Sequence, residues 1–112
     1  MTMFGPELKK GSLEMLILSL VETVPRHGYD IGKLVEARSG GALTFALPTL
    51  YPTLLRLESR GWIKGRWVEK AGERERCFYR LTPAGRRVLV EKRSTWRAYV
   101  DAVNAVMGSG DA

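Results

Sequence analysis

The spacing of hydrophobic residues changes at Gly61, and this change restricts the chain to folds that join helices to a short β-hairpin. Before Gly61, apolar residues recur at the three- and four-residue intervals of amphipathic helices. This spacing predicts helices over 12–23, 28–38 and 48–60. After it, residues 62–81 form two β-branched and aromatic runs around a polar turn, which is the pattern of a β-hairpin.

Two prolines mark the start of the third predicted helix. The first four N–H groups of a helix have no partner within it, so a proline there loses no hydrogen bond. With Thr49 as the N-cap, Pro52 falls within this first turn, and the helix is expected to begin at Pro48 or Thr49. The inward face is predicted to consist of Leu50, Leu54 and Leu57. The helical spacing also predicts a shared outward face made of Thr49, Pro52, Thr53, Arg56 and Arg60.

The second strand of the predicted hairpin has two unlike faces. Cys77, Tyr79 and Leu81 alternate with charged or aromatic neighbours, so this face is expected to be buried, with Cys77 acting as a small apolar residue. Trp62 and Trp67 are expected to pack in the domain core and on the hairpin.

A long helix is predicted over residues 83–107, with Thr82 as its N-cap and a glycine-rich stop after it. Twenty-five residues span about 37 Å, more than the small body that precedes them. The helix carries an apolar seam that this body is not expected to cover, made of Leu89, Trp96, Val100, Val103 and Met107. We therefore expect a dimerisation helix.

These elements give a mainly α chain with a β-hairpin wing. The expected organisation is a leader over 1–11, a winged helix-turn-helix over 12–82, the dimerisation helix over 83–107 and a flexible tail over 108–112. In a winged helix-turn-helix, the third helix enters the major groove of DNA and the hairpin reaches the flanking backbone.

The charge distribution agrees with a nucleic-acid partner. The chain has a net charge of +6, and residues 56–93 alone carry +7 from twelve basic and five acidic residues. We expect Arg56, Arg60 and Lys64, together with Arg74 and Arg76 at the hairpin tip, to contact phosphates. Thr49, Pro52 and Thr53, with Arg56 beside them, are expected to read base edges.

Composition and motifs argue against the other broad classes of function. The single cysteine allows no internal disulfide, and the longest apolar stretch, residues 13–21, is too short to span a membrane, so we expect a cytoplasmic protein without a membrane partner. His27 is the only histidine, no metal-ligand spacing surrounds it, and it is expected to make a loop contact or cap a helix. No nucleophile or phosphate-binding motif is present, so the protein is not expected to be an enzyme or to hold a cofactor.

The sequence resembles the PadR family of bacterial transcriptional regulators in its short form with one C-terminal helix. The resemblance covers roughly residues 11–107 and is carried by the blocks His27-Gly28-Tyr29-Asp30-Ile31, Thr49-Leu50-Tyr51-Pro52 and Tyr79-Arg80-Leu81-Thr82. It implies a homodimeric repressor that binds a palindromic operator and releases it on binding a small molecule. It also implies that the Tyr51 hydroxyl contacts a phosphate and that Trp96 can form an aromatic wall for a planar effector. The wing departs from the family pattern, because Glu73 and Glu75 interrupt its basic run.

The sequence thus predicts a sequence-specific DNA-binding regulator. Two other classes stay open at this stage. One is a dimeric winged-helix module that binds a protein partner and no DNA, and the other is a dimeric ligand carrier whose DNA-binding unit has degenerated.

Overall fold

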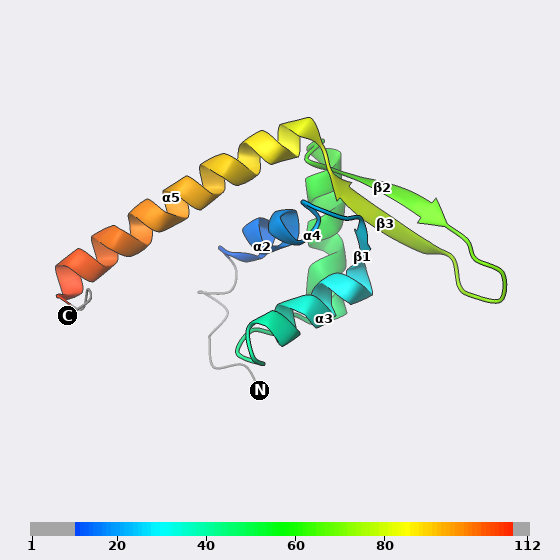
Figure 1. The fold of residues 1–112 in the computed structure, drawn as a ribbon, viewed down its shortest axis with the longest axis horizontal. Coiled ribbons are helices and arrows are strands. Elements are labelled where there is room, and N and C mark those ends of the chain that lie inside the picture. Colours follow the sequence, from blue (N-terminus) through cyan, green and yellow to red (C-terminus); the bar gives the residue numbers. More distant parts are fainter. Residues whose placement is uncertain (1–10, 109–112) are drawn as a thin grey trace.

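Three helices, a β-hairpin and a long final helix follow one another along the chain (Figure 1). The structure is a computed structural model and describes residues 11–108, so most of the predicted leader and tail lie outside the described residues. The described elements are α2 (Leu13–Leu20), β1 (Arg26–His27), α3 (Gly28–Arg38), α4 (Leu47–Ser59), β2 (Ile63–Val68), β3 (Arg76–Leu81) and α5 (Pro83–Met107). The fold class predicted from the sequence is confirmed.

The core lies where α2, α3, α4 and the start of α5 meet the sheet. Each helix contributes the residues of its apolar face, and the fully buried side chains include Ile17, Leu18, Ile31, Leu50, Leu54, Leu57, Ile63 and Leu89. The three leucines predicted to face inward from α4 are therefore in the core. Burial of such side chains is the main favourable contribution to folding.

One predicted helix end, that of α2, and one predicted helix start, that of α4, differ from the observed ones. Ser12 occupies the N-cap position of α2 but makes no capping hydrogen bond through its side chain, and α2 ends at Leu20, three residues before the predicted end. The N-cap of α4 is Ala46, so Thr49 is not the cap. The carbonyl of Ala46 accepts from the N–H groups of both Thr49 and Leu50, which places Thr49 inside the first turn.

Pro52 lies inside α4, beyond the first turn to which the sequence assigned it. A proline there cannot donate to the carbonyl four residues earlier, which belongs to Pro48. Both prolines are exposed, so this carbonyl faces the solvent side of the helix, where water can replace the missing donor.

The hairpin forms the outer part of a three-stranded antiparallel sheet with strand order β1-β3-β2. Ile63 pairs with Leu81 and Val68 pairs with Arg76, close to the predicted strand bounds. The buried face of β3 is confirmed for Tyr79 and Leu81, and Cys77 is half-buried. The sequence did not predict β1, because a two-residue strand has too few residues to show an alternating pattern.

The two tryptophans of the hairpin region have different surroundings. Trp62 packs against the core, as expected, and Arg60 and Lys92 lie over its ring. Trp67 is 65% exposed, so the expectation that it packs on the hairpin is wrong. Its strand, β2, extends beyond the helices toward the tip of the hairpin (Figure 1).

Helix α5 has the predicted bounds and crosses the core only at its start. The Thr82 side chain accepts from the Gly85 N–H, and Gly108 ends the helix with a φ of 70°. A side chain at residue 85 would collide with the Trp62 carbonyl, so this glycine allows α5 to start directly against the turn between α4 and β2. No helix among residues 11–108 is long and apolar enough to cross a membrane.

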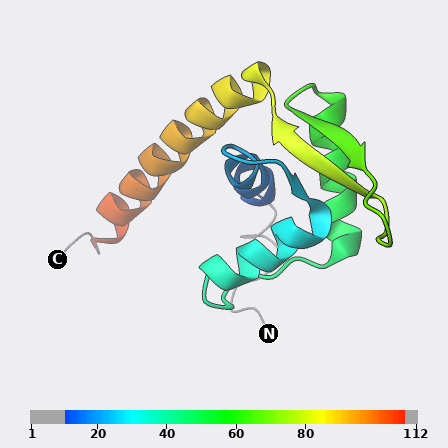
Figure 2. The same ribbon diagram turned by 45° about the vertical axis from the view of Figure 1, so that its right-hand side comes forward.

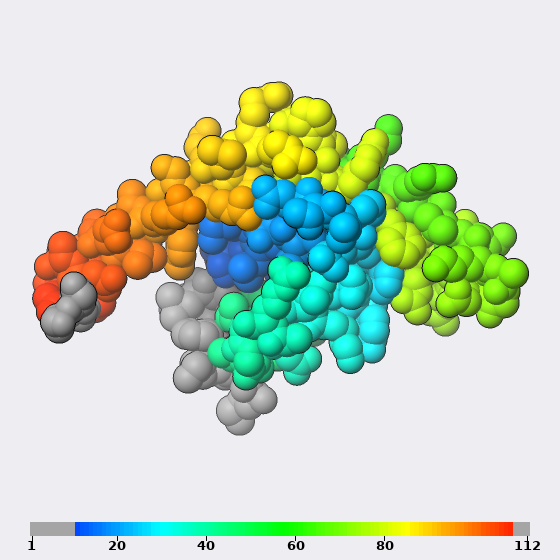
Figure 3. Space-filling view, viewed as in Figure 1, coloured from blue at the N-terminus to red at the C-terminus, as the bar shows by residue number. Residues whose placement is uncertain are grey.

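Leu89 is fully buried in the core of its own domain, so its assignment to an uncovered seam is wrong. The rest of the seam lies beyond the body, where Trp96 and Met107 are exposed and Val100 and Val103 are half-buried. In Figure 3, the second half of α5 projects from the body on the side opposite the hairpin.

Candidate nucleic-acid interface

A groove lies between α4 and the hairpin, and we call it the helix–wing groove. Its volume is about 510 Å³. Its lining includes Tyr29, Leu47, Tyr51, Leu55, Trp67, Arg74, Glu75 and Arg76. Figure 2 shows α4 and the hairpin beside each other on one side of the molecule. The groove joins the predicted recognition helix to the tip of the predicted wing.

Tyr51 lies in this groove with its ring against the start of α3. A Cβ at Gly28 would lie 2.8 Å from Tyr51 Cε1, so only glycine lets the ring approach this closely. The ring is partly exposed, which leaves its hydroxyl at a surface shared with Arg74 and Arg76. This position suits the phosphate contact implied by the resemblance, and that contact stays a prediction.

His27 connects the start of α3 to the wing. Its Nδ1 accepts from the Asp30 N–H at 3.2 Å, which confirms the predicted cap, and its Nε2 lies 3.0 Å from Arg76 Nη1. A neutral imidazole has one acceptor nitrogen, so it can accept from Asp30 or from Arg76 but not from both at once. Burial lowers the pKa of His27, and the nearby Arg76 guanidinium lowers it further.

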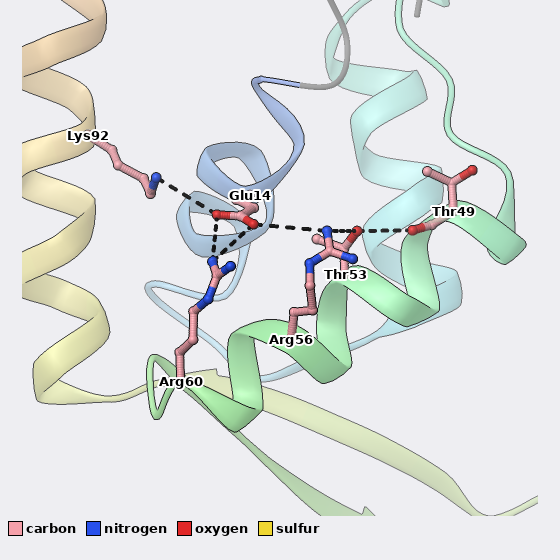
Figure 4. A network of polar contacts seen from close by, with 6 residues as sticks. All are labelled: Glu14, Thr49, Thr53, Arg56, Arg60 and Lys92. Carbon is pink, nitrogen blue, oxygen red and sulfur yellow. Dashed lines mark hydrogen bonds and ion pairs between the residues drawn. The ribbon is translucent and has the colours of Figure 1, made fainter.

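The predicted outward face of α4 is turned partly toward α2. Figure 4 shows this arrangement, in which Thr53 and Arg56 form a chain of contacts that ends at Glu14. Thr53 is only 3% exposed. Its hydroxyl donates to the Thr49 carbonyl and accepts from Arg56 Nη2, each at 3.1 Å. The expectation that Thr53 lies on an exposed face is therefore wrong.

Glu14 forms ion pairs with basic residues of two other helices, α4 and α5. Arg60 Nη1 lies 3.1 Å from both of its carboxylate oxygens, Arg56 Nη2 lies 4.0 Å from Oε2, and Lys92 Nζ lies 3.9 Å from Oε1. The sequence carries no local signal for this cluster, because Glu14 and Arg60 are 46 residues apart and no short-range spacing relates them.

The centre of the exposed face of α4 is apolar. Leu55 is 62% exposed although its neighbour Leu54 is completely buried. Leu55 and Leu47 both line the helix–wing groove, and neither was among the predicted site residues. A signal was available, because Leu55 falls outside the inward series of leucines on this helix.

The remaining predicted site residues lie on two separate surfaces. Thr49 and Pro52 are exposed on α4, whereas Lys64 lies with Arg66 and Arg80 in a separate hollow on the sheet. Successive side chains of a strand point to opposite faces of the sheet, so this hollow lies on the face opposite Tyr79. Of the predicted basic residues, the structure brings only Arg74 and Arg76 into the groove.

The chemistry of the groove is that of a binding surface. Burial raises the pKa of the Cys77 thiol and that of the Tyr79 hydroxyl, so both groups are held in their protonated forms. Within residues 11–108, no three His, Cys, Asp or Glu side chains are grouped so that they could hold a metal ion.

The helical body, the hairpin and the groove between them define a winged helix-turn-helix protein. Residues 17–91 match the PadR-like family of transcriptional regulators, and the chain belongs to this family. The members of the family are transcriptional regulators and not enzymes.

Individual relatives agree with this assignment. The transcriptional regulator Rv3488 of Mycobacterium tuberculosis is 38% identical over 89 residues, which is 80% of this chain and 66% of that protein. A solved PadR family transcriptional regulator from Eggerthella lenta is 37% identical, with a TM-score of 0.79 over 90% of this chain and 86% of the other. A transcriptional regulator from Clostridium thermocellum is 27% identical, with a TM-score of 0.84 over 91% and 96% of the two chains.

Proposed function

We propose that this protein is a cytoplasmic, homodimeric repressor that binds a palindromic operator and releases it when a small molecule binds. The observation that carries DNA binding is the helix–wing groove, where the exposed side of α4 and the wing arginines line one surface. A recognition helix in the major groove and a wing on the flanking backbone require this arrangement.

In this proposal, each wall of the groove has its own role. Arg74 and Arg76 neutralise phosphates, and Tyr51 binds a phosphate through its hydroxyl. Thr49 and Pro52 meet base edges from the exposed side of α4. Three further basic residues lie outside the groove and add to the affinity for DNA by contacting phosphates on either side of it, namely Arg56, Arg60 and Lys64.

The second half of α5 supplies the proposed dimer contact. Its seam from Trp96 to Met107 carries apolar side chains that the body of the same chain leaves open. Pairing two such helices would place the two α4 helices about one DNA turn apart, roughly 34 Å. Trp96 and Tyr99, whose ring centroids are 6.3 Å apart, offer aromatic surface for a planar effector between the subunits.

Selection of bound duplexes from a random pool tests DNA binding and symmetry together. A palindromic sequence is the expected result, and the affinity for it should fall steeply with salt. Arg74→Gln and Arg76→Gln should each reduce the slope of log K against log salt by about 0.9, the contribution of one phosphate contact.

The control for this test is Arg87→Gln, which removes an exposed charge from α5 outside the groove and should leave the slope unchanged. An unchanged slope in the wing variants would contradict the wing assignment. Failure of the unaltered protein to bind any duplex in dilute buffer would overturn DNA binding itself.

A further inference from the structure

The part of α4 that faces the groove lacks the side chains that read most base pairs. Residues 47–55 contain no Arg, Lys, Asn, Gln, Asp or Glu. Bidentate recognition of guanine requires Arg or Lys, and that of adenine requires Asn or Gln. Among residues 47–55, the side-chain hydroxyls are those of Thr49, Tyr51 and Thr53, and the hydroxyl of Thr53 is already bonded inside the protein.

The same surface instead presents aliphatic carbon. Leu55 is the most exposed leucine of α4, and Leu47, about two helical turns earlier, lines the same groove. Leu55 is not part of the core, because it is 62% exposed, whereas Leu50, Leu54 and Leu57 of the same helix are completely buried. The major-groove feature that an aliphatic side chain can distinguish is the C5-methyl group of thymine.

The opposite wall of the groove favours DNA over an apolar protein segment as the occupant. Arg74, Glu75 and Arg76 line the groove near its wing end, which leaves a net positive charge there. Neither arginine pairs with a carboxylate in the ion pairs of residues 11–108. An apolar floor with cations at one side complements a ligand that has phosphates outside and methyl groups inside.

We propose that Leu55 is a specificity-determining residue that contacts thymine methyl groups, so that each operator half-site has thymine beneath α4. This inference rests on the proposed function and deepens it, since it names the base and the atom that are read.

Replacement of thymidine by deoxyuridine removes only the methyl group and tests the proposal directly. The probe is the tightest duplex selected from a random pool, remade with deoxyuridine at one thymidine of the half-site at a time. At one or two positions, the unaltered protein should lose about fourfold in affinity, the effect of one buried methyl group. Leu55→Ala should bind the two forms of the duplex equally.

The matched control is Val24→Ala, which shortens an exposed aliphatic side chain outside the groove and should keep the discrimination. Because Leu55 is largely exposed, Leu55→Ala should unfold at the same temperature as the unaltered protein. A second selection with Leu55→Arg should change the contacted thymine to guanine, since arginine binds guanine O6 and N7.

Equal binding of every deoxyuridine duplex by the unaltered protein would overturn the inference and leave the proposed function standing. Discrimination that persists in Leu55→Ala would also overturn it. If the unaltered protein binds no duplex, the proposed function fails, and the inference fails with it.

Discussion

At the scale of single residues, Glu14 restricts two of the predicted DNA-contacting arginines. Its carboxylate lies 3.1 Å from Arg60 and 4.0 Å from Arg56. An arginine cannot give the same N–H groups to this carboxylate and to a phosphate at the same time. Any phosphate contact through these arginines therefore competes with an anion inside the protein.

We expect Glu14→Gln to raise the affinity for the selected duplex about 1.4-fold to fivefold at low salt, because it removes this competitor. That range corresponds to the 0.2–1 kcal/mol typical of an exposed ion pair. Titration of labelled duplex measures the change. Glu22→Gln is the control, since Glu22 loses the same charge but binds Arg93 and Arg86 of α5. An equal gain in both variants would show only an effect of net charge and would contradict the prediction.

At the scale of elements, His27 caps α3 and lies at the base of the wing. Its cap depends on a neutral ring, because a protonated imidazole has no acceptor for the Asp30 N–H. Protonation would also place a second positive charge beside Arg76. The start of α3 and the position of the wing arginine therefore respond together to the charge of one ring.

We expect the folded protein to lose about 1 kcal/mol of stability as the pH falls from 7.5 to 5.5, the usual effect of losing an N-cap. The pKa of His27 is lowered from 6.5 in the folded state, so the unfolded chain takes up the proton first as the pH falls below that value. Urea unfolding at several pH values measures this loss. His27→Asn keeps a capping acceptor that does not titrate, and its stability should vary little over this range. If His27→Asn kept the full pH dependence, the assignment to His27 would be wrong.

At the scale of the whole molecule, one apolar face of α5 belongs to the domain core in its first half and to an exposed surface in its second half. Leu89 at its start is buried in the domain core, and residues seven and fourteen positions later continue the same face beyond the body. The length of the helix makes this possible, because only its first half lies against the domain. The second half leaves an apolar surface that a second copy of the chain would cover.

We expect the double variant Trp96→Ala and Val103→Ala to weaken the dimer about thirtyfold, the effect of losing a central interface residue worth about 2 kcal/mol. Sedimentation at micromolar concentration should then show single subunits, and the affinity for the palindrome should fall. Val90→Ala is the control, since Val90 is exposed on a different side of α5 and should not affect assembly. A sedimentation coefficient of one subunit for the unaltered protein would contradict the dimer.

Local signals in the sequence were sufficient for the longer elements of the fold. Thr82 and the following proline start α5 where predicted, and the left-handed Gly108 ends it. The alternation in β3 identified its buried face, and the leucine spacing identified the buried face of α4. These signals act between residues a few positions apart, and such residues are neighbours in any helix or strand. The amino-acid sequence by itself therefore determined the order and type of the longer elements, and the PadR-like family.

Only the tertiary structure decided which exposed residues share a surface. Helical spacing grouped Thr53 and Arg60 with the outward residues of α4, but packing against α2 buried the first and paired the second with Glu14. The fold also left Leu55 exposed in the groove and placed Lys64 in a separate hollow from the wing arginines. The physical reason is that the exposure of a side chain depends on which other element of the folded chain packs against it. The partner that covers a side chain can be dozens of residues away, where no local periodicity reports it.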